Sequence, residues 1–273
     1  MAATTTNGVP SRRRRRPHVL VLPLPSRGHL LPLLDFAHRL STRHGVALTV
    51  AVTASDLPLL SAFLASTPLA AALPFHLPDA SLPENSNHAL LAVHLSGIRA
   101  PLLSWARSRP DDPPTVVVSD FFLGWAQLLA DDLGVPRVVF YASGAFAVAA
   151  LEQLWNGALP LDPKISVVLD TLPGSPAFPY EHADQFIDAR LVVDLRGAAV
   201  RVAEGAAAVP DAATLARALA DAVDGAKCGD VRAKAAALAA AAAAAVEEGG
   251  SSRVAFESMA KELETACMSP SFG

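Results

Sequence analysis

The sequence predicts an α/β fold: a doubly wound, Rossmann-like parallel sheet, followed by a helical remnant of a second domain of the same kind. Three observations predict it. Short apolar runs typical of buried strands alternate with longer helix-like segments over the first 155 residues. The longer segments repeat apolar residues at three- and four-residue spacing. Beyond residue 183 strand-like runs almost disappear while helical segments continue. Such alternation is typical of a parallel sheet covered by helices.

The first part of the chain predicts five strands and five helices. The strands share continuous apolar runs, and we place them at 18–24, 46–52, 71–78, 115–120 and 136–141. The helices share an apolar face, and we place them at 28–45, 56–67, 88–109, 124–134 and 144–155. Gly45 is expected to end the first helix, and Pro101 is expected to kink the third.

The last third of the chain predicts helices with almost no sheet to cover. Residues 156–182 form an irregular, proline-bearing segment that precedes it. The helical segments are 184–197, 211–223, 230–250 and 252–266. Asp211 is expected to cap one helix, and the pair Gly249–Gly250 to stop another. Only residues 198–202 resemble a strand, so this third is expected to be part of a domain.

Composition excludes several functional classes. The 273 residues are 52% hydrophobic, which is enough for a large core. The net charge of −4 gives no general attraction to nucleic acid or to acidic membrane surfaces. The two cysteines, Cys228 and Cys267, are too few and too late in the chain for a disulfide scaffold or a cysteine-ligated metal site. We therefore expect no metal, no nucleic-acid partner and a reducing compartment.

Five consecutive arginines, Arg12 to Arg16, allow two interpretations. One is a nuclear address or a contact with nucleic acid. The other is a disordered basic tail over residues 1–17, which are polar and show no periodicity. We favour the tail, because no aromatic residue or second basic cluster accompanies the arginines.

No stretch of the sequence is expected to span a membrane, since none approaches the roughly 20 apolar residues that a bilayer requires. The apolar run after the arginines is too short for a secretory signal and is interrupted by Pro23, Pro25, Arg27 and His29. These features favour a cytoplasmic protein without a membrane span.

His29 and Asp120 are the candidate catalytic pair. His29 follows the first predicted strand after a short turn, and Asp120 ends the fourth. In the common strand order 3-2-1-4-5 these strands are neighbours where the winding reverses, and ligands bind outside their carboxyl ends. A carboxylate that accepts from one imidazole nitrogen leaves the other as a base. The alternative is that His29 merely begins a helix and Asp120 caps the next one.

Four stretches resemble plant UDP-dependent glycosyltransferases, which glycosylate small acceptors such as flavonoids. They are HVLVLPLPSRGHLLPLLDFAHRL and VVVSDFFLGWAQLLADDLGVPRVVFYASGAF in the first half, and ADQFIDARLVVDLRGAAVRV and EEGGSSRVAFESMAKELE in the second. Together they cover nearly the whole chain. The resemblance implies the GT-B architecture of two Rossmann-like domains, an inverting transfer, and a UDP-sugar co-substrate without metal or other cofactor.

The resemblance also assigns individual residues. His29 matches the base that takes the proton of the acceptor hydroxyl, and Asp120 matches the carboxylate that orients it. Asp184 and Gln185 match the Asp-Gln pair that binds the hydroxyls of the donor sugar, a task that suits polar side chains able to form two hydrogen bonds. Ser143 matches a hydroxyl near the donor. Within the family, a glutamine at the position of Gln185 favours glucose as the donor sugar.

The sequence departs from the family in its nucleotide-binding signature. That signature begins Trp-Ala-Pro-Gln and passes through His-Cys-Gly-Trp-Asn-Ser, and neither motif occurs here. We therefore expect a large internal block to be missing, with the join at about residues 182/183. The domains would then be a basic tail at 1–17, an acceptor-binding domain at 18–182 and an incomplete donor-binding domain at 183–273.

Two functions follow as expectations. The first is the parent activity, transfer of a hexose from a UDP-sugar to a hydroxyl of a small-molecule acceptor. The second is a catalytically dead remnant that binds apolar small molecules without turnover. Since each lost contact weakens donor binding, the UDP-sugar is expected to bind weakly or not at all.

Overall fold

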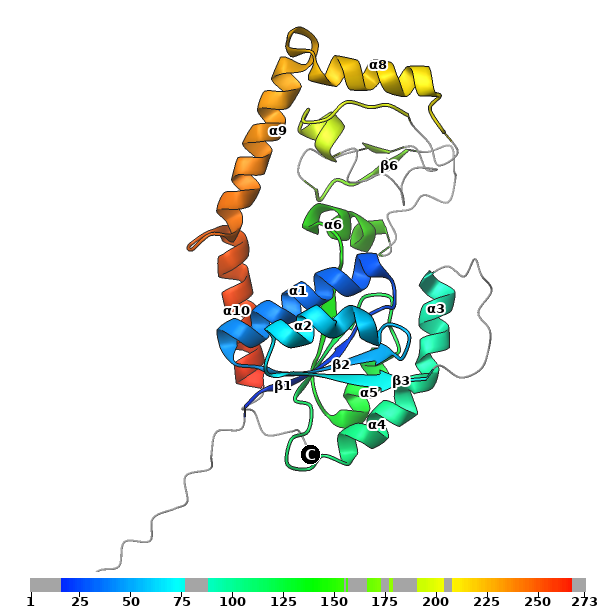
Figure 1. Cartoon of the computed structure of the whole chain (residues 1–273), viewed down its shortest axis with the longest axis vertical. Helices are drawn as coiled ribbons and strands as arrows, with labels where there is room; N and C mark the ends of the chain where they lie inside the picture. The colour runs from blue at the N-terminus through cyan, green and yellow to red at the C-terminus, as the bar shows by residue number, and fades with distance from the viewer. Residues whose placement is uncertain are drawn as a thin grey trace, which may run out of the picture. The chain divides into compact units, whose positions relative to one another are not determined.

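Five parallel strands form the central sheet of the structure, which is a computed structural model that describes residues 16–76, 88–154, 156, 166–172, 177–178, 191–203 and 208–266. The strands are β1 (His18–Leu22), β2 (Ala47–Thr53), β3 (Ala70–Phe75), β4 (Val116–Asp120) and β5 (Arg137–Phe140). Their order is β3-β2-β1-β4-β5, which confirms the predicted fold class. The winding therefore reverses between β1 and β4. Figure 1 labels β1, β2 and β3 of this sheet.

The three central strands are buried on both faces. Every residue of β1 and β4 is buried, and so is all of β2 except its first residue. This burial explains the continuous apolar runs in the sequence, because a strand covered on both faces has no polar side. The edge strands β3 and β5 are only partly buried. The register aligns Leu22 of β1 with Ser119 of β4, so their carboxyl ends meet at one edge.

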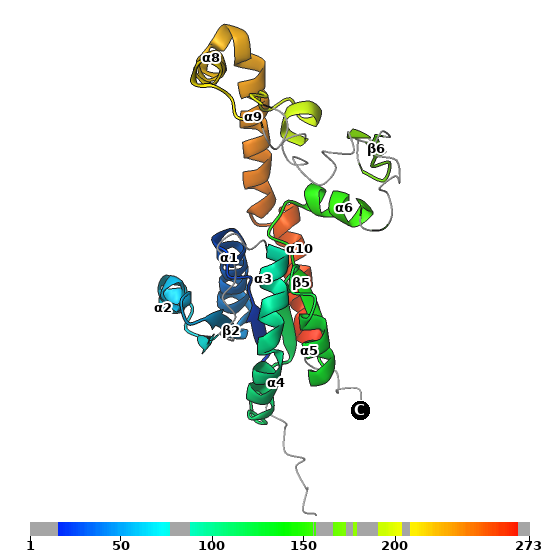
Figure 2. The ribbon, with the colours of Figure 1, turned by 90° about the vertical axis from the view of Figure 1, so that its right-hand side faces the viewer.

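Helices cover both faces of this sheet. α1 (Arg27–His44) lies beside α2 (Ser61–Ser66), which follows a short 3-10 turn, η1 (Leu57–Leu60). Figure 2 shows α1 and α2 on the side of the sheet opposite α5 (Ala126–Leu133). Gly45 ends α1 and Gly134 ends α5, both with positive φ (66° and 64°), a conformation that glycine adopts without strain.

A broken helical run covers the other face together with α5. It consists of α3 (His88–Leu95), the 3-10 turn η2 (Ser96–Ile98) and α4 (Arg99–Arg107). Buried residues of all these helices pack with Leu20 and Leu22 of β1. Pro101 lacks the N–H that would bond the carbonyl of Gly97, so the predicted kink lies one turn before the proline, at η2.

The same run corrects one expectation. His88–Arg107 spans 20 residues with a mean hydropathy of 1.3, long and apolar enough by length and composition to cross a membrane. The expectation that no stretch of the chain approaches the length of a membrane span is therefore wrong. The run contains Arg99 and Arg107, and Leu95, Ile98 and Leu102 are at most 4% exposed within the core of the sheet. It is therefore packed as a covering helix of an α/β domain.

Contacts divide the chain into two compact units. One comprises Met1–Ala142 together with Ser258–Gly273, and the other comprises Ser143–Glu257. The predicted boundary at 182/183 falls outside the described residues and stays a prediction. The first unit holds the sheet, and Ala260 and Leu263 near the end of α10 (Ser251–Ala266) are buried.

The second unit is mostly helical. α6 (Ala145–Gln153) packs its Ala147 and Ala150 with Val167 of β6 (Val167–Val168) and with Leu169 and Leu172, which follow β6. β6 pairs antiparallel with β7 (Ala177–Phe178). A π-helical turn, η5 (Leu191–Leu195), comes next, then α8 (Ala212–Val223) and α9 (Gly225–Val246). Asp211 caps α8 as predicted, because its side chain accepts from the amide of Thr214.

The strand predicted at 198–202 is wrong. These residues have no regular structure, and no described strand pairs with them. Instead, Arg201 folds back and its Nη2 donates to Oδ1 of Asp194 in η5, at 2.7 Å. A strand requires a partner for its backbone groups, so a β-branched sequence alone does not make one.

Candidate active site

His29 and Asp120 meet at the point where the winding of the sheet reverses. Asp120 is the last residue of β4, and His29 lies in the first turn of α1, directly after β1. Because β1 and β4 are paired in parallel, both residues lie at the carboxyl edge. Nδ1 of His29 lies 2.8 Å from Oδ2 of Asp120. The structure thus brings together the two residues that the sequence proposed as a pair.

The carboxyl group of Asp120 fixes the orientation of the imidazole. It is fully buried, and its Oδ1 accepts from the backbone amide of Phe122 at 3.0 Å. Its Oδ2 is an acceptor for His29, so Nδ1 of His29 carries the donated hydrogen. Nε2 is then the basic nitrogen, and the side chain of His29 is 14% exposed. This arrangement suits removal of a proton from a bound hydroxyl.

The turn after β1 sets the position of His29. The amide of Ser26 donates to the carbonyl of Leu24 at 2.8 Å, and the amide of His29 donates to the carbonyl of Ser26 at 2.9 Å. Two prolines in this stretch, Pro23 and Pro25, restrict the backbone before the helix. His29 thus lies in the first turn of α1.

Aromatic rings surround the imidazole of His29. The rings of Phe121 and Phe122, which follow Asp120 directly, lie 5.8 and 5.6 Å from it, centroid to centroid. Tyr141 stacks on Phe121 at 5.0 Å with an interplanar angle of 16°. Such a wall presents flat apolar surface next to a base, which suits a planar hydroxylated molecule.

His88 is a site residue that sequence reasoning missed. It begins α3, its ring centroid lies 4.9 Å from that of His29, and it also contacts Phe122 at 5.5 Å. From the sequence it is one histidine among several without metal-ligand spacing. No local signal identifies it, because only tertiary packing brings the start of α3 to the carboxyl end of β1.

Arg137 lies behind Asp120, at the start of β5. Its Nε donates to Oγ of Ser119 at 2.8 Å, and its Nη2 donates to the carbonyl of Leu123 at 3.1 Å. Burial lowers the pKa of Arg137 from its ordinary value, while Tyr141 and Asp120 act in the opposite direction. The buried carboxyl group of Asp120 thus favours the charged form of Arg137.

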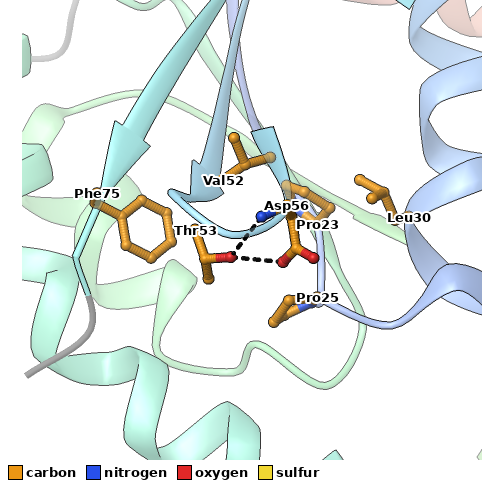
Figure 3. A pocket seen from close by; sticks show the side chains of 7 residues that line it. All are labelled: Pro23, Pro25, Leu30, Val52, Thr53, Asp56 and Phe75. Carbon is orange, nitrogen blue, oxygen red and sulfur yellow. Dashed lines mark hydrogen bonds between the residues drawn. The ribbon is translucent and has the colours of Figure 1, made fainter. Parts of the chain in front are cut away.

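A small pocket lies nearby, at the ends of β1, β2 and β3. Pro23, Leu30 and Phe75 line its apolar side, and Thr53 and Asp56 line its polar side (Figure 3). Oγ1 of Thr53 donates to Oδ2 of Asp56 at 2.6 Å and accepts from the amide of Asp56 at 3.2 Å. The pocket has a volume of about 10 Å³, which suits a single water molecule at most. It is too small for a sugar or a polycyclic acceptor.

The roles of the other predicted site residues stay predictions. Ser143 is exposed, precedes α6 and belongs to the second compact unit. Asp184 and Gln185 lie outside the described residues, as do Arg12 to Arg15. Within the described ranges no group of three or more histidine, cysteine or acidic residues could hold a metal ion.

Comparison with curated proteins gives plant relatives that match part of this chain. The chain is 43% identical over 150 residues to flavonol 3-O-glucosyltransferase UGT89B1 of Arabidopsis thaliana, which covers 50% of this chain and 31% of the relative. It is 33% identical over 192 residues to UDP-glycosyltransferase 89A2 of the same plant, covering 66% and 41%. Over the matched stretches the chain is similar to plant UDP-dependent glycosyltransferases. It spans well under half the length of these curated relatives, and no family model matches it.

Solved structures of the family share the fold. Arabidopsis thaliana UGT89C1 complexed with UDP-L-rhamnose matches with a TM-score of 0.70 at 19% identity, covering 91% of this chain and 99% of that chain. Phytolacca americana UGT2 complexed with UDP-2fluoro-glucose and pterostilbene matches with a TM-score of 0.50 at 25% identity, covering 63% and 42%. The parallel sheet of this chain is therefore a Rossmann-like sheet of the GT-B fold.

Proposed function

We propose that the chain contains the acceptor-binding, base-supplying half of a glycosyltransferase whose parent activity moves a hexose, glucose by preference, from a UDP-sugar to a hydroxyl of a small flavonoid-like acceptor. The observation that supports it is the 2.8 Å contact between Nδ1 of His29 and Oδ2 of the buried Asp120. The aromatic rings of Phe121 and Phe122 beside His29 support a planar acceptor.

In the proposed reaction Nε2 of His29 takes the proton of the acceptor hydroxyl. The oxygen forms a bond to the anomeric carbon as the bond from that carbon to the diphosphate breaks, and its electron pair leaves with UDP. Attack from the face opposite the diphosphate inverts the anomeric centre. Asp120 keeps the imidazole oriented and balances the positive charge that develops on it.

The donor side of the proposal rests on the resemblance. Asp184 and Gln185 would bind the sugar hydroxyls, with Ser143 near the donor. Residues 18–182 would form the acceptor domain and residues 183–273 an incomplete donor domain, joined where an internal block is missing. We place the protein in the cytoplasm, with a UDP-sugar as co-substrate and without metal or other cofactor.

A second candidate, acceptor binding without turnover, is favoured by the missing nucleotide signature. That signature would hold the uracil, the ribose and the diphosphate, and each lost contact weakens donor binding. For this 273-residue chain we therefore expect binding of an acceptor and no appreciable sugar transfer.

Thermal unfolding of the full chain with quercetin, with UDP and with neither tests the proposal. Quercetin at about 100 times its Kd is expected to stabilise the fold by about 2.7 kcal/mol, and UDP is expected to leave the melting temperature unchanged. Stabilisation by neither compound would contradict an acceptor site. Transfer of glucose from UDP-glucose to quercetin by the full chain would rule out the second candidate and establish the complete activity.

A further inference from the structure

The guanidinium of Arg137 spans the segment that carries Asp120. Its Nε donates to Oγ of Ser119, the residue before Asp120, and its Nη2 donates to the carbonyl of Leu123, three residues after Asp120. Within this span the amide of Leu123 also donates to the carbonyl of Asp120 at 3.1 Å. A two-point contact of this kind links the side chain before the carboxylate to the backbone after it, and it requires the planar fork of arginine.

Charge explains why a cation lies at this position. Both acceptors of Arg137 are neutral, and its described contacts include no ion pair. The Asp120 side chain is 0% exposed and receives hydrogen bonds from a backbone amide and from His29. A buried carboxylate is costly unless a positive charge lies near it. Asp120 is one of the two groups that raise the pKa of Arg137, against the lowering by burial, so the two charges attract each other.

We propose that Arg137 is a positioning residue for the pair of His29 and Asp120: its fork fixes the turn from β4 to α5, and its charge balances the buried carboxylate. This inference rests on the proposed function, in which His29 is the base. Through Asp120, Arg137 determines which nitrogen of His29 carries the hydrogen. Through the same turn, it holds Phe121 and Phe122 against the imidazole.

A purely structural role would make a different prediction. If Arg137 only fastened β5 to the turn, its loss would lower stability and leave His29 unchanged. In the described part of the chain, the titratable and charged groups packed around the pair are His88 at the start of α3, Arg137, and Tyr141, which stacks on Phe121. Of these, only Arg137 contributes a permanent positive charge.

Nitrogen-15 NMR of the full, ligand-free chain tests the proposal. For Arg137→Gln we expect the fraction of His29 protonated at Nδ1 to fall at least halfway toward the value of Asp120→Asn. We also expect exchange of the Phe122 amide hydrogen to accelerate about tenfold, the change for loss of one ordinary hydrogen bond. Arg137→Lys keeps the charge and loses the fork, so it should retain the tautomer and still show faster Phe122 exchange.

Arg99→Gln is the matched control, because Arg99 also donates to a backbone carbonyl, that of Leu128, and to a side chain, that of Asp132. It should leave the His29 signal unchanged. The proposal would be overturned if Arg137→Gln left the tautomer of His29 unchanged. It would also be overturned if Arg99→Gln or Arg137→Lys changed that tautomer as much as Arg137→Gln does. Should Arg137→Gln fail to fold, Arg137→Lys decides alone: unchanged Phe122 exchange overturns the proposal.

Asp120→Asn separates this inference from the proposed function. If that variant leaves the tautomer of His29 as in the wild type, the pairing itself fails, and the proposed function fails with it. If Asp120→Asn changes the tautomer and Arg137→Gln does not, only the role of Arg137 is refuted.

Discussion

His29 donates from Nδ1 to Oδ2 of Asp120 across 2.8 Å, although the two residues come from opposite sides of the point where the sheet reverses its winding. Oδ1 of the same carboxyl group accepts from the amide of Phe122 at 3.0 Å. Each oxygen therefore has its own donor. Because the backbone amide in the β4–α5 turn fixes the carboxyl group, the imidazole on α1 that donates to its other oxygen has a single favoured orientation.

Asp120→Asn is expected to reverse the tautomer of His29. The amide oxygen of the new side chain should accept from the amide of Phe122, which turns the NH₂ group toward Nδ1 of His29. Nδ1 must then accept, so the hydrogen moves to Nε2 and the base is lost. Nitrogen-15 NMR of the full chain should show the change directly.

Asp112→Asn is the control for this substitution. Nδ1 of His18 lies 3.3 Å from the carboxylate of Asp112, but it also donates to the backbone carbonyl of Asp112 at 3.1 Å. That carbonyl keeps the hydrogen of His18 on Nδ1 whichever side chain is present at position 112. The tautomers of His18 and His29 should both stay unchanged in Asp112→Asn. If His29 reversed its tautomer in Asp112→Asn as well as in Asp120→Asn, the substitutions would act through a general loosening of the fold.

His88→Ala is expected to weaken acceptor binding about fivefold, because one hydrogen-bonding ring beside His29 is lost, worth about 1 kcal/mol. The ring contacts both His29 and Phe122, so its loss also opens the aromatic wall. Calorimetric titration with quercetin would measure the change.

His94→Ala supplies the comparison, since His94 lies near the other end of the same helix, α3. Quercetin should bind this variant as it binds the wild type. Equal affinities of the wild type and both variants would place the acceptor away from His88.

Leu129→Ala is expected to destabilise the sheet unit by about 2–5 kcal/mol. Leu129 of α5 is 0% exposed and belongs to the cluster around Leu20 and Leu22, so truncation leaves a cavity between helix and sheet. Leu128→Ala is the matched control, because Leu128 is the preceding residue and is 52% exposed. Urea unfolding should separate the two variants. Equal losses would mean that α5 does not cover this face of the sheet in solution.

Much of the sheet unit could be predicted from sequence, because its signals are local. The continuous apolar runs of β1 and β4 report burial on both faces, and Gly45 and Gly134 adopt the positive φ that ends a helix. Once strands and helices alternate, few topologies remain, and the order with β1 beside β4 is the common one. That order alone brought His29 and Asp120 to one edge.

What could not be predicted depends on tertiary partners. His88 reaches His29 only because α3 begins beside the carboxyl end of β1, and nothing in its sequence neighbourhood reports that. The residues around Arg201 have strand-like composition, but they lack a neighbouring strand among the described residues. Arg137 is an unremarkable first residue of a strand until its contacts with Ser119 and Leu123 are known.

The cap of α8 is expected to weaken in acid. The amide of Thr214 donates to Oδ1 of Asp211 at 2.6 Å, and this hydrogen bond lowers the pKa of Asp211 below its ordinary value of 3.8. A carboxyl group whose pKa is lower in the folded state stabilises that state above the unfolded pKa. The contribution is lost as the pH falls from 3.8 through the lower folded value.

Protection of the Thr214 amide against hydrogen exchange, corrected for the intrinsic rate, should therefore fall in the wild type as the pH drops below 3.8. Asp211→Asn keeps an oxygen acceptor that does not titrate, so its protection should be independent of pH over this range. Asp211→Ala should show low protection throughout. A wild type whose protection follows that of Asp211→Asn at every pH would mean that the charge of Asp211 does not stabilise the first turn of α8.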